Sequence, residues 1–380
     1  MEKRSYFLQS VRTRKAFHRI LEDAFNATSK NDEEKSYENH LPKAYIVEYH
    51  DENVINGQKS FYDLLKNKFN FSGYNLHKTE DVDLLYLVTP TCEFLIDTYD
   101  NKYNRFITFH TLSYYRDVNR FIHLDLTKYD RRFDLVYFTN SFFENVADNQ
   151  PNEIAGWETK FKSDIFHSFD NQINPKGNFK YLHYKNAWNV YKELYKNDNK
   201  PNDLMKMPIH SLLFKNEGLV DIVYTKVRSD GHITAYAGSD FNEYLRVIEY
   251  FKQEYAKRIL KIEENSMSFS RVSNLEGSGY KVQGEPTIVE FEDKIINLED
   301  HLSKVFSASP PYRLAGIPKK IKDNYYSVTA LDLHVSNYIN FEITDKFTRI
   351  YLPKGSCGNT VERYVKLTQH LIDPNLKFVA

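Results

Sequence analysis

The chain has 380 residues, with 51 Lys and Arg against 52 Asp and Glu, so its formal net charge is -1. This balance excludes a protein that coats nucleic acid through an overall basic excess, so any nucleic-acid contact must use a local patch. Hydrophobic residues make up 41% of the chain and aromatic residues 15%, which excludes a disordered tail or linker and indicates a packed globular protein.

The two cysteines, Cys92 and Cys357, lie far apart in the chain. They cannot form a disulfide framework, and they indicate a reducing compartment. Because no tight Cys/His cluster accompanies them, we do not expect a structural zinc site. The N-terminus lacks the apolar core of a signal peptide, and no apolar run approaches transmembrane length. We therefore expect a cytoplasmic protein without a membrane partner.

A helix and then a series of strands are predicted in the first 140 residues. Apolar residues recur near the helical period across residues 5–26. A strand at residues 44–50 and a short helix at residues 60–69 follow. Five further stretches are short and rich in aromatic and β-branched residues, which favours strands: Leu84–Thr89, Cys92–Thr98, Arg105–Thr111, Phe121–Leu126 and Phe133–Phe138. Their short connections favour a mixed or antiparallel sheet.

Helices and strands alternate less regularly in the rest of the chain. A helix is predicted at residues 181–197, and the Asp230-Gly231 pair predicts a tight hairpin between two strands. Asp240 or Ser239 can cap a long helix that begins at Phe241. Strands at residues 325–335, 338–344 and 348–354 form a predicted meander. In the closing helix, Arg363 and His370 share one face, and we interpret both as surface residues.

These patterns predict an α+β or α/β fold with two domains. Residues 1–200 would form a mixed β-sheet with flanking helices and carry the candidate site. Residues 201–380 would form a second α+β domain, for which binding of nucleic acid or of a partner is the candidate role. No flexible linker marks the boundary.

Acidic residues stand in unusual places between Arg131 and Asp164. Asp134 is the polar residue of an otherwise apolar strand, and an unpaired buried carboxylate is costly, so it should have a cation, a metal or solvent nearby. Residues 154–161 alternate as a strand does, which places Glu158, Lys160 and Lys162 on one face. Two carboxylates can hold Mg²⁺, and a lysine beside them can orient the attacking water.

This arrangement resembles the PD-(D/E)xK nuclease superfamily, with Asp134 at the first motif position and Glu158 and Lys160 at the second. The resemblance covers this one stretch and implies Mg²⁺-dependent cleavage of phosphodiesters in nucleic acid, of the restriction or anti-phage type. In that case Asp134, Glu158 and Lys160 are catalytic, and Asp134 and Glu158 are the metal ligands. No proline precedes Asp134, and the connection from Thr139 to Glu153 is long for a hairpin, which departs from the family pattern.

Other interpretations stay open. Glu-x-Lys occurs three times in the chain, so Glu158 and Lys160 can simply pair on the solvated face of a strand. The alternative function is that of a non-catalytic subunit of a microbial defence complex that binds nucleic acid or a protein partner. A third possibility is an enzyme that acts on some other small substrate. Candidate nucleic-acid-binding residues are the basic side chains near the motif and in the last third of the chain: Arg131, Arg132, Lys162, Lys319, Lys320 and Lys322.

Overall fold

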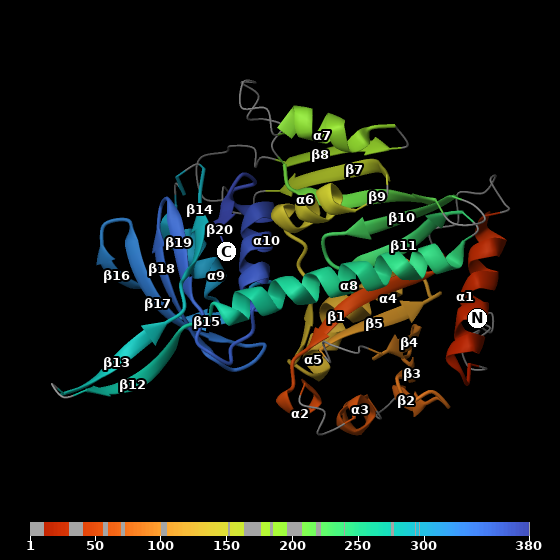
Figure 1. Cartoon of the computed structure of the whole chain (residues 1–380), viewed down its shortest axis with the longest axis horizontal. Coiled ribbons are helices and arrows are strands. Elements are labelled where there is room, and N and C mark those ends of the chain that lie inside the picture. The colour runs from red at the N-terminus through yellow and green to blue at the C-terminus, as the bar shows by residue number, and fades with distance from the viewer. Residues whose placement is uncertain are drawn as a thin grey trace.

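The computed structural model describes two large antiparallel sheets and a two-stranded one, and a long helix runs between the two large sheets (Figure 1). The described residues are 11–29, 41–55, 60–69, 73–99, 105–150, 153–162, 176–182, 185–195, 207–217, 222–238, 240–274, 277–292, 294–295 and 297–379. The α+β class predicted from the sequence is confirmed, and the pairings between the named strands are antiparallel.

The larger sheet has the order β2-β3-β4-β5-β1-β11-β10-β9-β7-β8, and β6 pairs with β1. Its strands are β1 (Lys43–Tyr49), β2 (Asn75–Lys78), β3 (Leu84–Val88), β4 (Glu93–Asp97), β5 (Phe106–Thr111), β6 (Phe133–Leu135), β7 (Glu153–Lys162), β8 (Lys176–Leu182), β9 (Ile209–Glu217), β10 (Ile222–Arg228) and β11 (His232–Ala237). The predicted hairpin turn lies between β10 and β11, where Gly231 adopts a φ of 77° that an L side chain rarely takes. One edge of β1 pairs with β11 in its first half and with β6 in its second half.

Helices cover the larger sheet on both sides. They are α1 (Arg14–Ser29), α2 (Glu52–Ile55), α3 (Phe61–Phe69), α4 (Tyr115–Arg120), α5 (Leu126–Tyr129), α6 (Asn140–Asn149), α7 (Ala187–Tyr195) and α8 (Phe241–Glu264). The predicted cap of α8 is confirmed, because the Asp240 carboxylate accepts hydrogen bonds from the backbone N–H groups of Asn242 and Glu243. In Figure 1, α8 runs from the neighbourhood of α1 to the smaller sheet and so spans both halves of the molecule.

The strand predicted at Phe121–Leu126 is wrong. Residues Phe121–Asp125 form a π-helical segment between α4 and α5. Val118, Phe121, Ile122 and Leu126 are buried, and their spacing is that of one helical face. The aromatic and β-branched content of this short run favoured a strand, but its burial pattern continues the helix that begins at α4.

The smaller sheet has the order β15-β17-β18-β19-β14-β20, with β16 paired to β17. Its strands are β14 (Thr287–Glu290), β15 (Leu314–Gly316), β16 (Lys319–Lys322), β17 (Tyr325–Asp332), β18 (Tyr338–Thr344), β19 (Phe347–Tyr351) and β20 (Lys377–Val379); its helices are α9 (Leu298–Val305) and α10 (Asn359–Leu371). The predicted meander is confirmed as β17, β18 and β19. A separate hairpin, β12 (Ser268–Asn274) and β13 (Gly277–Gln283), extends away from the rest of the fold in Figure 1.

The predicted boundary between residues 200 and 201 lies outside the described residues. The larger sheet contains strands on both sides of it, since β7 pairs with both β8 and β9. One hydrophobic core extends from Val11 through α8 to Leu376, so apolar contacts connect the two sheets. In the described part of the chain, no helix combines the length and the apolar character needed to cross a membrane.

Candidate functional site

Asp134 is a buried anchor for the C-terminal helix. It lies opposite Glu48 in the pairing of β6 with β1 and is 1% exposed. Its carboxylate accepts hydrogen bonds from the Tyr137 hydroxyl at 2.8 Å and from the backbone N–H of Leu135 at 2.9 Å. Arg363 from α10 forms an ion pair with one carboxylate oxygen, and Arg313 lies 3.3 Å from the other. The predicted cation beside Asp134 is therefore confirmed.

The interpretation of Arg363 as a surface residue of the closing helix is wrong. Its guanidinium is buried and also donates to Asp332 at 2.7 Å. Helical periodicity placed Arg363 and His370 on one face of α10, but it could not show that this face packs on buried carboxylates. The two arginines occupy the space beside Asp134 where a metal ion would have to bind.

The strand that carries Glu158 has the predicted alternation. Thr159 and Phe161 of β7 are buried, whereas Lys160 and Lys162 are exposed and Glu158 is partly buried. The segments around Asp134 and Glu158 are strands of one sheet, as predicted, but β11, β10 and β9 lie between β1 and β7.

The partners of Glu158 come from neighbouring strands. Its carboxylate accepts hydrogen bonds from Lys226 at 3.1 Å and from Ser211 at 3.3 Å. Burial opposes its ionisation, but Lys226 holds the pKa of Glu158 below its ordinary value. Neither Asp134 nor Glu158 belongs to a group of three or more metal-ligating side chains within the described residues.

A cavity of about 540 Å³, which we call the basic pocket, brings Asp134 and Lys160 together without Glu158. It lies between the β7 to β10 part of the larger sheet, α10 and the segment before β15. Its charged lining residues are Lys160, Lys162, Arg228, Arg313, Lys366, Asp134 and Asp230, and its histidines are His123, His210 and His370. Positive charge therefore exceeds negative charge among the described residues that line it.

Both aspartates in the basic pocket already have cationic partners. The Asp230 carboxylate lies 3.1 Å from Arg228 and 3.3 Å from His123. The Asp134 carboxylate is paired with Arg363 and Arg313. Burial opposes ionisation of Asp230, yet Arg228 and His123 hold its pKa well below the ordinary value. Lys160 and Lys366, by contrast, have no carboxylate within ion-pair distance in the described part of the structure.

The buried cation and histidines of the basic pocket have altered proton affinities. Burial lowers the pKa of Lys366, whose ammonium lies 5.9 Å from the centre of the Tyr137 ring. Burial and then Arg228 lower the pKa of His210 to about 4, and burial places the pKa of His370 well below its ordinary value. Burial therefore disfavours the charged form of both histidines.

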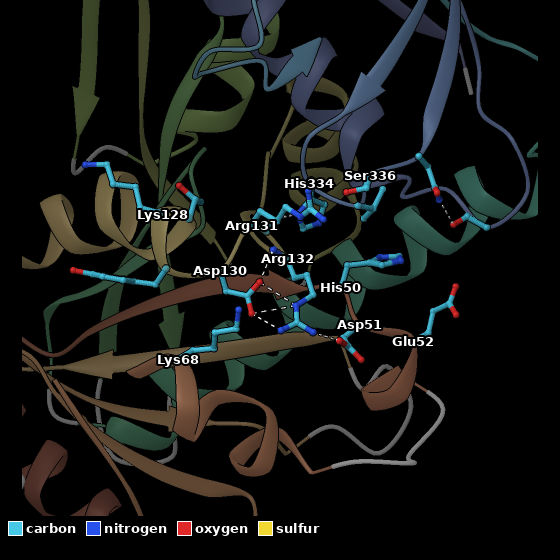
Figure 2. A pocket seen from close by; sticks show the side chains of 15 residues that line it. His50, Asp51, Glu52, Lys68, Lys128, Asp130, Arg131, Arg132, His334 and Ser336 are labelled. Atoms are coloured by element: carbon cyan, nitrogen blue, oxygen red, sulfur yellow. Dashed lines mark hydrogen bonds and ion pairs between the residues drawn. The ribbon is translucent and has the colours of Figure 1, made fainter. Parts of the chain in front are cut away.

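The other predicted nucleic-acid-binding residues lie elsewhere. Lys319, Lys320 and Lys322 are exposed on β16, where Lys320 pairs with Asp323 at 2.9 Å. Arg131 and Arg132 line a second cavity of about 750 Å³ between the two sheets. Figure 2 shows that the Arg132 guanidinium lies between the carboxylates of Asp130 and Asp51, so its charge is already balanced.

A cluster missed by the sequence analysis borders this second cavity. Glu48, His50, His334 and Cys357 offer ligand atoms that all lie within 4.8 Å of one another. His50 and His334 line the cavity (Figure 2), whereas Glu48 and Cys357 are buried behind them. The Glu48-x-His50 spacing at the end of a strand was the available sequence signal, but His334 and Cys357 lie 286 and 309 residues from Glu48.

Without an ion, this cluster is a buried ion-pair network. Burial opposes protonation of His334, but hydrogen bonding to Cys357 and Glu48 raises its pKa to about 10. Arg105 also pairs with Glu48, and it donates to the carboxylate of Glu263 at 2.7 and 2.9 Å. The cluster therefore connects β1, Arg105 just before β5, α8, and the two loops that carry His334 and Cys357.

Comparison with known proteins identifies one family. The sequence model of a family described as MJECL33-like protein matches residues 6–380. A protein of Methanocaldococcus jannaschii, described as "Uncharacterized protein MJECL33", is 27% identical over 136 residues. That alignment covers 36% of this chain and 32% of the relative, so the chain matches about a third of the relative's length. No solved structure matches.

Proposed function

This chain belongs to the MJECL33-like protein family, and for this member we propose that the function is binding of nucleic acid in the basic pocket. The observation that carries the proposal is the pair of lysines, Lys160 and Lys366, that face one cavity and have no carboxylate within ion-pair distance among the described residues. Lys366 is partly buried, and a buried ammonium is costly without an anion. Lys160 is exposed and adds a second positive charge to the same cavity. A phosphate group supplies that anion, and phosphate contacts with Lys and Arg dominate the affinity of proteins for nucleic acid.

A basic surface leads to the pocket along β7 and its neighbours. Lys160 and Lys162 point to the same side of β7, about 6–7 Å apart along the strand. Lys180 of β8 lies opposite Glu158 in the strand register and is exposed. Lys226 of β10 lies on the other side of Glu158. An extended strand of nucleic acid can thus contact several of these ammonium groups in succession, with one phosphate inside the pocket.

The test is the salt dependence of binding, measured by fluorescence anisotropy with labelled single- and double-stranded DNA and RNA. We expect Lys160→Ala and Lys366→Met each to weaken binding and to reduce the slope of log affinity against log salt by about 1. Lys320→Ala is the matched control, because Lys320 is equally exposed but paired with Asp323 on a distant strand. Unchanged slopes in both pocket variants, or equal losses in the control, would contradict the proposal.

Mg²⁺-dependent cleavage in the same pocket is a second proposal. It is favoured by the presence of Asp134 and Lys160 in one cavity. It requires Asp134 to exchange an arginine for a metal ion, and for this reason binding is the better supported function. Incubation of each substrate with Mg²⁺, Mn²⁺ or EDTA separates the two. Metal-dependent cleavage that is lost in Asp134→Ala, Glu158→Ala and Lys160→Ala would establish the nuclease, whereas binding without cleavage supports a binding subunit of a microbial defence complex.

We also propose that the protein acts in the cytoplasm, with a protein partner as a further candidate ligand. Cys92 and Cys357 are both buried and form no disulfide, which supports a reducing environment. Fractionation of the source cells, followed by immunoblotting, tests this location.

A further inference from the structure

The ligand atoms of Glu48, His50, His334 and Cys357 lie within 4.8 Å of one another, close enough to surround one ion. The Glu48 carboxylate lies 3.2 Å from His334 Nε2, 3.3 and 3.4 Å from Cys357 Sγ, and 3.9 Å from His50 Nδ1. Bonds of about 2.0–2.3 Å to zinc imply ligand-to-ligand separations of about 3.3–3.8 Å in a tetrahedron. The side chains are therefore close to the required positions before any ion is added.

We propose that these four side chains bind one divalent transition-metal ion of the zinc type. A set with one thiolate, two imidazoles and one carboxylate favours zinc, whereas Mg²⁺ and Ca²⁺ prefer oxygen ligands alone. The site is independent of the basic pocket, so the proposal does not depend on nucleic-acid binding.

The surrounding groups hold the ligands as outer-shell partners do in metal sites. His334 Nδ1 lies 2.9 Å from the backbone carbonyl of Arg131, which fixes the N–H there and leaves Nε2 to face Glu48 and Cys357. The Arg105 guanidinium pairs with one oxygen of Glu48 and lies 3.2 Å from Cys357 Sγ, where it can stabilise a thiolate. Glu263 in turn holds Arg105 with both carboxylate oxygens.

His50 supplies a second, independent sign of a ligand. Its Nδ1 atom is buried and has no partner at hydrogen-bond distance among the described residues, with the Glu48 carboxylate 3.9 Å away. A buried ring nitrogen without a partner loses its hydrogen bonds to water without compensation. Coordination of an ion next to Glu48 would satisfy this atom.

The ion would cross-link the larger sheet to loops that adjoin the smaller sheet. Glu48 lies on β1, and His50 directly follows this strand. His334 lies in the loop between β17 and β18, and Cys357 lies in the loop between β19 and α10. Because His50 and His334 border the second cavity (Figure 2), the ion has a route of entry from solvent. Binding would release the protons of His334 and Cys357, after which the charges balance, since Arg105 and a divalent ion offset Glu48, Glu263 and the Cys357 thiolate.

The proposal is tested on the full chain, stripped with a chelator and then titrated with ZnCl₂ or CoCl₂. We expect one ion per chain, and a thiolate-to-cobalt charge-transfer band in the near ultraviolet. Cys357→Ser should remove that band, and His50→Gln should weaken zinc binding about 100-fold or more, because loss of an outer-shell partner alone costs about 10–100-fold. Cys92→Ser is the matched control, since Cys92 is also buried and forms no disulfide but lies outside the cluster.

The outcomes separate a metal site from an ion-pair network. Retention of the cobalt band in Cys357→Ser, or zinc binding as tight in His50→Gln as in the control, would place the metal elsewhere. Absence of zinc binding by the wild-type chain would leave the cluster as a network of Arg105, Glu48 and His334. If Cys357→Ser does not fold, the cobalt spectrum of the wild type and the zinc affinity of His50→Gln still test the proposal, because His50 is partly exposed and its replacement disturbs the core less.

Discussion

Asp134 and Glu48 are cross-strand neighbours on β6 and β1, both buried, yet their surroundings differ. Asp134 lines the basic pocket, but its carboxylate already contacts Arg363, Arg313 and Tyr137. Glu48 contacts one arginine and is otherwise surrounded by two imidazoles and a thiol. A buried carboxylate is therefore not a sufficient sign of a metal site, because the atoms around it decide whether it anchors the fold or binds an ion.

The largest expected effect concerns the Asp134 side of this comparison. Arg363→Met would leave Asp134 and Asp332 buried without their main cation, so the free energy of unfolding should fall by about 3–5 kcal/mol. Urea denaturation measures this change. Arg246→Ala, which removes an exposed arginine of α8, should change stability by less than about 0.5 kcal/mol. A loss below about 1 kcal/mol in Arg363→Met would show that the ion pairs do not anchor α10.

A somewhat smaller effect is expected from zinc on the Glu48 side. An ion that binds the folded chain at about 100 times its dissociation constant should raise the free energy of unfolding by about 2.7 kcal/mol. The Asp134→Asn chain should gain as much as the wild type, whereas Cys357→Ser should gain nothing. Urea denaturation with zinc or with EDTA measures this gain. A gain that is lost in Asp134→Asn would show that the ion binds beside Asp134 and not beside Glu48.

Acid should remove the stabilising contribution of Asp230, a carboxylate of the basic pocket, in a defined pH range. Burial opposes ionisation of Asp230, and Arg228 with His123 holds its folded-state pKa well below the ordinary value. Its stabilising contribution is therefore complete above the unfolded pKa of about 3.9 and is lost as the pH falls below it toward the folded pKa. Between about pH 4 and 2, the free energy of unfolding should fall less steeply with acid for Asp230→Asn than for the wild type, and equal slopes would contradict this role.

The smallest effect separates nucleic-acid binding from metal-dependent cleavage. Glu158→Gln removes a negative charge from the basic surface and releases Lys226, so affinity for nucleic acid should rise about two- to fivefold. Anisotropy titrations at low salt measure it. If Glu158 instead holds a catalytic metal, the same variant should lose cleavage, with no gain in affinity.

The sequence predicted what depends on local patterns. The alternation of β7, the cap at Asp240 and the need of Asp134 for a cation all follow from neighbouring residues and from the cost of burying a charge. The identity of that cation could not be predicted, because Arg363 lies 229 residues away in the chain. Cys357 and Glu48 are separated by 309 residues, so a search for closely spaced Cys and His could not find their cluster.

X-ray absorption at the zinc edge of the zinc-loaded chain tests the assignment most directly. The account predicts one sulfur ligand at about 2.3 Å and nitrogen and oxygen ligands at about 2.0–2.1 Å, unchanged in Asp134→Asn and without sulfur in Cys357→Ser. A spectrum with oxygen ligands alone that changes in Asp134→Asn would contradict it and would assign the metal to the Asp134 side instead.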